Sequence, residues 1–192
     1  MKKILIGTHN DGKFKEISYL LKKRIKKISP KKLKIISPKE TGKTFLANAK
    51  IKAVHFSNHT ALPVISDDSG LCIKSLKWKP GIYSARWASK HGSFLKAMNY
   101  ILKIMKNKKD RRAVFVCSLC FKNSKGKMIT ATGKVKGNIS RKILGKNGFG
   151  YDPIFIPLSR NITFSQMSKK EKINSDHRFI AFKRLKKKIK TF

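Results

Sequence analysis

The sequence has 192 residues, of which 47 are Lys or Arg and 9 are Asp or Glu, so its formal net charge is +38. This length suits one complete hydrophobic core, or one domain split into two lobes around a cleft, and we expect residues 1–192 to form a single domain. The first apolar run is too short for a signal peptide and no later run approaches a membrane span, so we expect a cytoplasmic protein without a membrane partner.

The large positive charge suggests nucleic acid as a partner. Arg, however, supplies only 8 of the 47 basic residues, and the Lys residues are spread over many short runs. No basic stripe with interleaved aromatic residues emerges from the sequence. A Lys-rich surface of this kind is what an AT-rich genome produces where the surface is unconstrained, so we expect no specific nucleic-acid binding.

The three cysteines are Cys72, Cys117 and Cys120. An odd number fits a reducing compartment better than a disulfide scaffold. Cys117 and Cys120 fall in one predicted strand, where they should point to opposite faces, and no second Cys or His pair lies nearby to complete a zinc site. We therefore expect both to be buried core residues.

The hydrophobic pattern predicts alternating strands and helices. Strands are expected at residues 2–7, 33–37, 63–70, 71–76, 112–122 and 128–139, the last two joined by a turn at 123–126. One helix is expected to run from Phe14 and to include Ile25 and Ile28, and further helices are expected at 44–58, at 93–106 and after His177. A loop is expected at 79–86, and a capping box at Ser168 and Glu171. This alternation favours an α/β fold with a mixed sheet.

The segment GTHNDGK, residues 7–13, lies between a predicted strand and a predicted helix and has the glycine and lysine spacing of a P-loop. A P-loop needs Ser or Thr after the lysine to hold Mg²⁺, and Phe14 occupies that position. Backbone N–H groups at a helix start, together with Lys13, still form an anion site. An ordinary tight turn between strand and helix has the same pattern.

Each acidic residue of so basic a chain is informative. The nine are Asp11, Glu16, Glu40, Asp67, Asp68, Asp110, Asp152, Glu171 and Asp176. Asp67 and Asp68 end a predicted strand, where α/β proteins border their ligand crevice. Adjacent strand residues point to opposite faces, so one of the two should be the direct metal ligand or base. With Glu40 they suit a Mg²⁺ site for hydrolysis at phosphorus, although an acid pair before Ser-Gly is also compatible with the cap of a turn.

The segment GKNGFGYDP, residues 145–153, combines glycines with Phe149, Tyr151 and Asp152. Glycines let the backbone approach a ligand, an aromatic face can stack on a base, and a carboxylate can accept from a ring N–H. A glycine-rich turn with core aromatics is the alternative. The segment DHR, residues 176–178, places an imidazole beside a guanidinium before the last helix. An ordinary surface cluster of polar residues is the alternative interpretation.

Six motifs follow one another along nearly the whole chain: THNDGK, KETGKTFLANAKIKA, SDDSGLCI, PGIYSARWA, GFGYDPIF and EKINSDHR. Together they resemble the inosine triphosphate pyrophosphatase family, whose N-terminal nucleotide loop belongs to a different fold from the P-loop. The resemblance implies a homodimer of elongated α/β subunits, each with a central mixed sheet flanked by helices and two lobes around a nucleotide cleft. It also implies Mg²⁺-dependent hydrolysis of ITP, dITP and XTP to the monophosphate and pyrophosphate.

The resemblance further implies which residues form the site. Asp68 would be the catalytic base and, with Glu40, the metal ligand. The substrate would be bound by Thr8, His9, Asn10, Asp11, Gly12, Lys13, Ser69, Phe149, Gly150, Tyr151, Asp152, Lys172, His177 and Arg178, with Lys52 as a further phosphate ligand. Within this set, the phosphates would fall to Thr8, Asn10 and Lys13, and the base to residues 149–152, Lys172, His177 and Arg178.

Two positions depart from the family pattern. Lys39 stands where a second acid often precedes the metal-site glutamate, and Asp176 stands where Ser usually precedes the His-Arg pair. Asp176 could pair with Arg178 and weaken its donation to the six-position carbonyl that distinguishes hypoxanthine and xanthine from adenine. Two other classes stay open: a P-loop-like NTPase that releases phosphate, and a basic nucleic-acid-binding protein.

Overall fold

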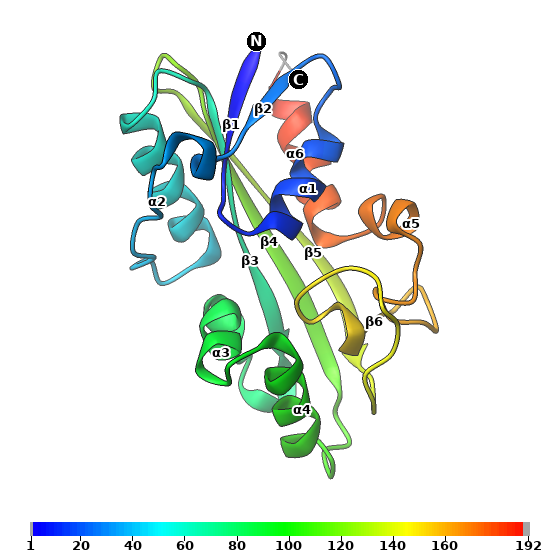
Figure 1. Ribbon diagram of the computed structural model, residues 1–192. Coiled ribbons are helices and arrows are strands. Elements are labelled where there is room, and N and C mark those ends of the chain that lie inside the picture. Colours follow the sequence, from blue (N-terminus) through cyan, green and yellow to red (C-terminus); the bar gives the residue numbers. More distant parts are fainter. Residues whose placement is uncertain (1, 190–192) are drawn as a thin grey trace. The chain divides into compact units, whose positions relative to one another are not determined.

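A computed structural model describes residues 2–189, in which six strands form one sheet in the order β2-β1-β3-β4-β5-β6 (Figure 1). Strand β1 (Lys3–Gly7) pairs in parallel with both β2 (Lys26–Ile28) and β3 (Val64–Ile73), and β5 (Met128–Ile139) pairs antiparallel with β6 (Phe155–Pro157). Strand β4 (Arg112–Lys122) lies between β3 and β5. The mixed sheet and its helices confirm the predicted α/β class.

The described chain divides into two compact units. The first contains residues 2–68, 117–133 and 177–189, and the second contains residues 69–116 and 134–176. These boundaries fall within or at the ends of β3, β4 and β5, so each unit has its own part of those strands and its own core. No helix in the described part of the chain is long and apolar enough to cross a membrane.

In the first unit, the alternating side chains of β1 bury apolar groups on both faces. Ile4 and Ile6 pack in one cluster with Ile17 of α1 (Asp11–Leu20) and Leu185 of α6 (His177–Lys188). Leu5 packs in another cluster with residues that include Phe56 of α2 (Phe45–Asn58). Figure 1 shows α1 and α6 together on one side of these strands and α2 on the other. The period of two along a strand thus decides which helix each side chain meets.

The cysteines of β4 follow the same alternation. Cys117 is buried in the cluster that contains residues of α1 and α6, whereas Cys120 is buried against Ala49 and Ala53 of α2. The prediction of two buried core cysteines on opposite faces is confirmed.

The second unit has an aromatic core. The ring of Phe155 lies 4.6 Å from that of Phe115 and 5.3 Å from that of Phe164, measured between centroids, and α4 (Phe94–Ile104) adds Met98 and Ile101 to the same cluster. The remaining helical elements of this unit are α3 (Ser84–Lys90), α5 (Lys169–Ile173) and the 3₁₀ turns Lys74–Leu76, Gly81–Tyr83 and Asp152–Ile154.

Several predicted elements are confirmed together with their end signals. Thr44 caps α2 by accepting from the backbone N–H of Ala47, and Ser93 caps α4 in the same way. The capping box of Ser168 and Glu171 is present at α5. The two long strands have the predicted bounds, 112–122 and 128–139.

Two predictions near the N-terminus are wrong. The helix α1 ends at Leu20, and Ile28, expected on the same helix, lies in β2, where parallel pairing with β1 overrides the helical spacing. Residues 33–37 do not form a strand: Pro30–Leu33 is a 3₁₀ turn, and Lys34 follows it with a left-handed φ of 54°. A left-handed residue cannot continue an extended strand.

The prediction that one strand ends at Gly70 and another begins at residue 71 is also wrong. Strand β3 continues through this glycine to Ile73, so residues 63–70 and 71–76 are not two strands. Gly70 is required for a different reason, because a Cβ there would collide with the backbone of Gly81 and the side chain of Ser84. The loop expected at 79–86 instead contains the 3₁₀ turn Gly81–Tyr83 and the start of α3.

Candidate active site

The sequence suggested that Asp67 and Asp68 end a strand. In the structure they lie inside β3, which continues to Ile73. Strand β1 ends at Gly7, whose partner in the sheet is Ser66, so both aspartates follow directly after the β1–β3 pairing. They are buried, with residue exposures of 0% and 4%. As predicted from their adjacency, their side chains meet different helices, and the two carboxylates therefore have different environments.

Asp67 belongs to a buried network of charges in the first unit. Its Oδ2 lies 3.4 Å from Nζ of Lys13 on α1 and 3.2 Å from Nη2 of Arg178 on α6. Arg178 also pairs with Glu16 of α1. Burial alone would raise the pKa of Asp67, but the charges of Lys13, Arg178 and Lys52 outweigh burial and hold this pKa well below its usual range. Asp67 therefore stays ionised and anchors cations.

Asp68 faces α2. The side-chain amide of Asn48 donates to Oδ2 of Asp68 at 3.0 Å, and the Oδ1 of Asn48 accepts from the backbone N–H of Gly42 at 2.8 Å. Burial raises the pKa of Asp68, and the nearby carboxylate of Glu40 raises it further against the opposing charges of Lys13 and Lys52. Asp67 is engaged by two cations, whereas Asp68 accepts from a neutral amide, so Asp68 suits the role of base better than Asp67.

Lys52 on α2 is a buried cation among three acids. Its Nζ lies 2.7 Å from Oε1 of Glu40, and only 6% of the residue is exposed. Burial alone would lower the pKa of Lys52, but Asp67, Glu40 and Asp68 together raise it. The side chain is thus an ammonium ion that these carboxylates stabilise.

The same carboxylates fit a divalent cation. Glu40 and Asp68 offer the oxygen ligands that Mg²⁺ prefers, and Mg²⁺ usually takes one or two carboxylates and completes its shell with water and phosphate. No group of three or more His, Cys, Asp and Glu residues within the described chain could hold a metal ion by itself. Glu40 and Asp68 would be the two protein ligands of such a cation.

The predicted nucleotide loop connects β1 to α1, as expected. The side chain of Asn10 caps α1 by accepting from the backbone N–H of Lys13 at 2.9 Å, and the N–H of Asn10 donates to the Oγ1 of Thr8 at 3.2 Å. The imidazole Nδ1 of His9 lies 2.6 Å from Oγ of Ser37. These contacts fix the loop and leave Lys13 directed at Asp67.

The other members of the predicted loop lie in the first turn of α1. Asp11 is on the surface and pairs with Lys31 at 2.7 Å, and Gly12 follows it with a partly buried backbone. Phe14, which stands where a P-loop has its metal ligand, packs against the core of the first unit. A P-loop metal site is therefore ruled out at this position.

In the second unit, Lys172 of α5 joins several residues predicted to bind the base. Its Nζ lies 2.8 Å from Oδ2 of Asp152, 3.9 Å from Oδ2 of Asp176 and 4.7 Å from the ring centroid of Phe149. The backbone N–H of Phe149 donates to the same Asp152 oxygen at 2.8 Å. Asp152 thus ties the glycine-rich loop to α5.

Tyr151 and its neighbours complete that loop. The hydroxyl of Tyr151 is buried and donates to the backbone carbonyl of Ser84 at 2.9 Å, and burial raises the pKa of Tyr151. Gly150 adopts φ 67°, a conformation that favours glycine. Ser69, which follows Asp68 on β3, is partly exposed.

His177 and Arg178 begin α6 in the first unit, and both are buried. The sequence suggested Asp176 as a partner for Arg178. In the structure, Glu16 and Asp67 pair with Arg178, while the carboxylate of Asp176 lies 3.9 Å from Lys172.

Sequence reasoning missed two residues of this site, Glu16 and Asn48. Glu16 carried a usable signal, since a buried acid at an inward helical position of a basic chain needs a cation. Asn48 also lies on the buried face of its helix, where an amide needs hydrogen-bond partners. Neither signal identifies the partner.

Comparison with known proteins assigns the chain to a family. The model of the Ham1 family matches residues 4–188. The chain belongs to the Ham1 family. A dITP/XTP pyrophosphatase of Dictyoglomus thermophilum is 40% identical over 190 residues, covering 95% of this chain and 92% of that protein. One from Gluconobacter oxydans is 39% identical over 177 residues, covering 92% and 85%.

A solved Ham1 structure shares the fold. The HAM1 protein of Coxiella burnetii superposes with a TM-score of 0.86 at 35% identity, covering 97% of this chain and 98% of that one. The resemblance drawn from six sequence motifs is thus confirmed by relatives of the same family over nearly the full chain.

Proposed function

We propose that this Ham1 protein hydrolyses the deaminated purine nucleoside triphosphates ITP, dITP and XTP to the monophosphate and pyrophosphate. The observation that carries the proposal is the pair of carboxylate environments on β3, in which Asp67 lies against Lys13 and Arg178, whereas Asp68 accepts from Asn48 and has a raised pKa. The names of its relatives, dITP/XTP pyrophosphatases, support the choice of substrate.

The proposed reaction is attack by water on the α-phosphorus. A bond forms between the water oxygen and the α-phosphorus, the bond from that phosphorus to the bridging oxygen breaks, and pyrophosphate leaves with the bridging oxygen. Asp68 takes the proton of the water. Mg²⁺, held by Glu40 and Asp68, would supply the positive charge that neutralises the phosphate oxygens.

Basic side chains of the first unit would hold the rest of the triphosphate. Lys13 and Lys52 already lie against carboxylates and, with the N–H groups at the start of α1, offer donors for phosphate oxygens. Thr8 and Asn10 shape this loop, and His9, Asp11 and Gly12 complete it.

Selection of the base is assigned to Phe149, Gly150, Tyr151, Asp152, Lys172, His177 and Arg178, with Ser69 as a further substrate contact. The guanidinium of Arg178 is a hydrogen-bond donor, and a six-position carbonyl could accept from it. Adenine has an amino group there and would leave such a donor unpaired. On the same family grounds we propose a homodimer, which light scattering of the purified protein tests.

A product assay tests the proposed reaction. The purified protein is incubated with ITP, XTP, GTP or ATP, with and without Mg²⁺, and the products are separated. We expect inosine monophosphate and pyrophosphate from ITP, only with Mg²⁺. Inosine diphosphate with phosphate would instead indicate an NTPase of the P-loop type, and an absence of turnover would contradict the proposal.

A single substitution tests the assigned base. Asp68→Asn keeps the hydrogen bond to Asn48 through its amide oxygen but cannot accept the proton of water. We expect kcat to fall by a factor of about 10² to 10⁴, while circular dichroism and the unfolding midpoint stay near those of the unchanged protein. Retained activity would move the role of base to another residue.

A further inference from the structure

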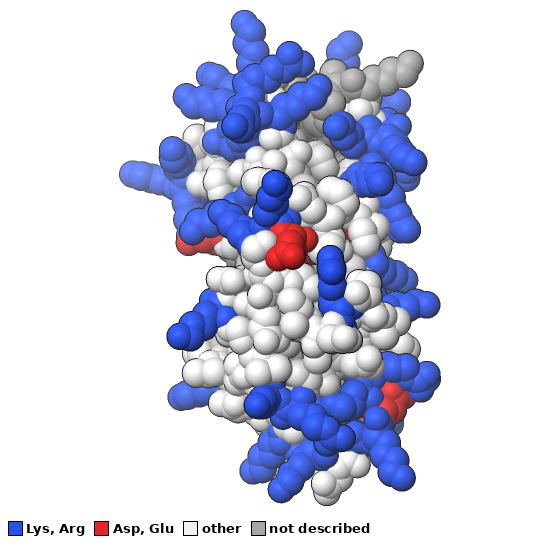
Figure 2. Space-filling model, turned by 90° about the vertical axis from the view of Figure 1, so that its right-hand side faces the viewer, with Lys and Arg blue, Asp and Glu red and all other residues white. Residues whose placement is uncertain are grey.

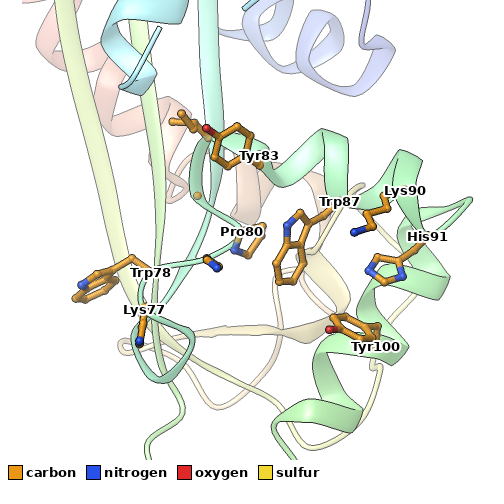
Figure 3. Close-up of a pocket in the computed structure, with 11 residues that line it drawn as sticks. Lys77, Trp78, Pro80, Tyr83, Trp87, Lys90, His91 and Tyr100 are labelled. Carbon is orange, nitrogen blue, oxygen red and sulfur yellow. The ribbon is translucent and has the colours of Figure 1, made fainter. Parts of the chain in front are cut away.

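The second unit contains an aromatic pocket to which the proposed reaction gives no role. It encloses about 610 Å³, a volume typical of ligand sites. Five of its lining residues have aromatic rings: Trp78, Tyr83, Trp87, His91 and Tyr100 (Figure 3). They come from the segment before α3, from α3 and its end, and from α4. Both tryptophans of the chain are among them.

Much of this aromatic surface faces solvent. Trp78, Tyr83 and Tyr100 are 52%, 48% and 40% exposed. The rings of His91 and Tyr100 stack with centroids 4.4 Å apart, and Trp87 meets Tyr100 edge-on at 5.9 Å. Figure 3 shows these three rings gathered on one side of the pocket. Trp78 and Tyr83 line the same pocket outside this ring cluster, and the guanidinium of Arg86 lies 4.8 Å from the ring centroid of Tyr83. Exposed aromatic groups on one surface are typical of a binding surface.

The loop that carries Trp78 is fixed in an unusual conformation. Lys77 and Trp78 have φ values of 53° and 64°, in the left-handed region that non-glycine residues seldom adopt. The N–H of Trp78 donates to the carbonyl of Ile73 at 2.9 Å, and the N–H of Ile73 donates to the carbonyl of Lys79 at 3.1 Å. Lys77 is the C-cap of the 3₁₀ turn Lys74–Leu76, so its left-handed conformation ends that turn and leaves Trp78 half-exposed at the surface.

The charge of the pocket has one sign. Lys77, Lys79 and Lys90 line it, and no Asp or Glu does. The chain has no acid at all between Asp68 and Asp110. Figure 2 shows that Lys and Arg cover much of one face of the molecule, with few acidic atoms among them. A ligand that complements this pocket is therefore flat, aromatic and anionic.

We propose that this pocket binds single-stranded nucleic acid without sequence preference. Unpaired bases would stack on the rings of Trp78, Tyr83 and Trp87, and the backbone phosphates would contact Lys77, Lys79 and Lys90. Aromatic platforms within a basic surface are the usual means of such binding, because every base has a stacking face. A single strand is favoured over a duplex since the faces of paired bases are covered by their neighbours.

The sequence alone suggested no basic stripe with interleaved aromatic residues. The fold produces one because it brings residues 77–83 next to Trp87, His91 and Tyr100, which lie on successive helical elements. The inference is independent of the proposed hydrolysis, since none of these residues is assigned to that reaction.

Tryptophan fluorescence tests the proposal directly, because both tryptophans of the chain line the pocket. The full chain is titrated with a 20-nucleotide oligo(dT) at several salt concentrations. We expect quenching that saturates, and an affinity that falls steeply with salt. A matched duplex and a base-free polyphosphate of similar charge serve as competitors, and both should compete at least ten-fold more weakly.

Two charge variants separate a site from a general effect of net charge. Lys77→Gln, Lys79→Gln and Lys90→Gln are combined in one protein, and Lys183→Gln, Lys186→Gln and Lys187→Gln on exposed positions of α6 in another. The two proteins have the same net charge. We expect at least ten-fold weaker binding for the pocket variant alone, with a salt slope smaller by about two, since each phosphate contact adds about 0.7 for single strands.

Trp78→Leu tests the stacking, and circular dichroism with the unfolding midpoint shows that each variant is folded. We expect Trp78→Leu to weaken oligo(dT) binding at least five-fold with both of these measures unchanged. Equal losses in the two charge variants, or equal competition by polyphosphate, would overturn the proposal. So would conversion of a dimer to a monomer by Trp78→Leu with oligo(dT) binding unchanged, since a second copy would then be the occupant of this surface.

Discussion

Arg178 on α6 places its Nη2 3.2 Å from Oδ2 of Asp67 on β3, and its Nη1 contacts Glu16 on α1. All three residues are buried, so one guanidinium connects a strand and two helices of the first unit. Two of its partners are separated from it by more than 100 positions in the sequence. The ion pairs of Arg178 therefore help to hold β3, α1 and α6 together.

Asp67→Asn is expected to destabilise the protein by about 3–5 kcal/mol, because it removes the buried carboxylate that pairs with Lys13 and leaves Arg178 with one fewer buried counter-charge. Urea unfolding at pH 7 measures this loss as a lower midpoint. Asp110→Asn is the matched control, since Asp110 pairs with Arg112 at the surface and should shift the midpoint little. Similar shifts in the two variants would show that the buried network contributes no more than a surface pair.

Stability is expected to fall on the acid side through Asp67. Its folded-state pKa is lowered relative to an unfolded value of about 3.9, so its contribution is fully present above that value. It is lost as pH falls through the folded-state pKa. Unfolding midpoints measured from pH 7 down to pH 2 should therefore decline below about pH 4, and Asp67→Asn should decline less steeply. Parallel curves for the two proteins would assign the acid loss to other groups.

Lys52→Met is expected to make the stability of the protein depend more strongly on the concentration of Mg²⁺ than it does in the unchanged protein. The substitution removes the ammonium ion that lies 2.7 Å from Glu40 and leaves the carboxylates of Glu40 and Asp68 without it. A divalent cation can replace the missing charge, so 10-fold steps in Mg²⁺ should raise the melting temperature more in the variant than in the unchanged protein. Lys122→Met, whose amine contacts Ser57, is the control. Equal responses to Mg²⁺ would contradict a cation site at these carboxylates.

Gly133→Ala is expected to cost about 1–3 kcal/mol and to lower kcat/KM. A Cβ at this position of β5 would meet the carbonyl oxygen of His177 and the backbone of Ala181, and so push the start of α6 away from the sheet. That start carries Arg178. Lys134→Ala, one position along the strand and exposed, should change neither quantity. Full activity in Gly133→Ala would show that α6 can shift without disturbing Arg178.

The parts of the fold that the sequence could predict are those with a regular local pattern. Strands 112–122 and 128–139 alternate over their length, and the caps of α2 and α4 are local hydrogen bonds of Thr44 and Ser93. The short strand β2 escaped prediction because its three residues gain their conformation from pairing with β1. The wrong prediction of a strand end at Gly70 has a related cause. The glycine is needed because the backbone of Gly81 approaches it closely, which the sequence does not show.

The site divides in the same way. The opposite directions of Asp67 and Asp68 followed from their adjacency in a strand, and the place of residues 7–13 between a strand and a helix followed from the sequence. The pairing of Arg178 with Glu16 could not be predicted, because it joins residues whose separation in the chain carries no periodic signal. The hydrogen bond from Asn48 to Asp68 could not be predicted either, because it joins a helix to a strand 20 positions further along the chain.

The position of the two aspartates inside a continuous strand also determines which changes of chain length the protein tolerates. Inserting or deleting one residue between Ser66 and Asp67 would exchange the faces on which the two carboxylates emerge. The carboxyl group now surrounded by Lys13 and Arg178 would meet Asn48, and the prospective base would be locked among cations. We therefore expect this protein to tolerate changes of length in the turns that flank β3, but not within the strand itself.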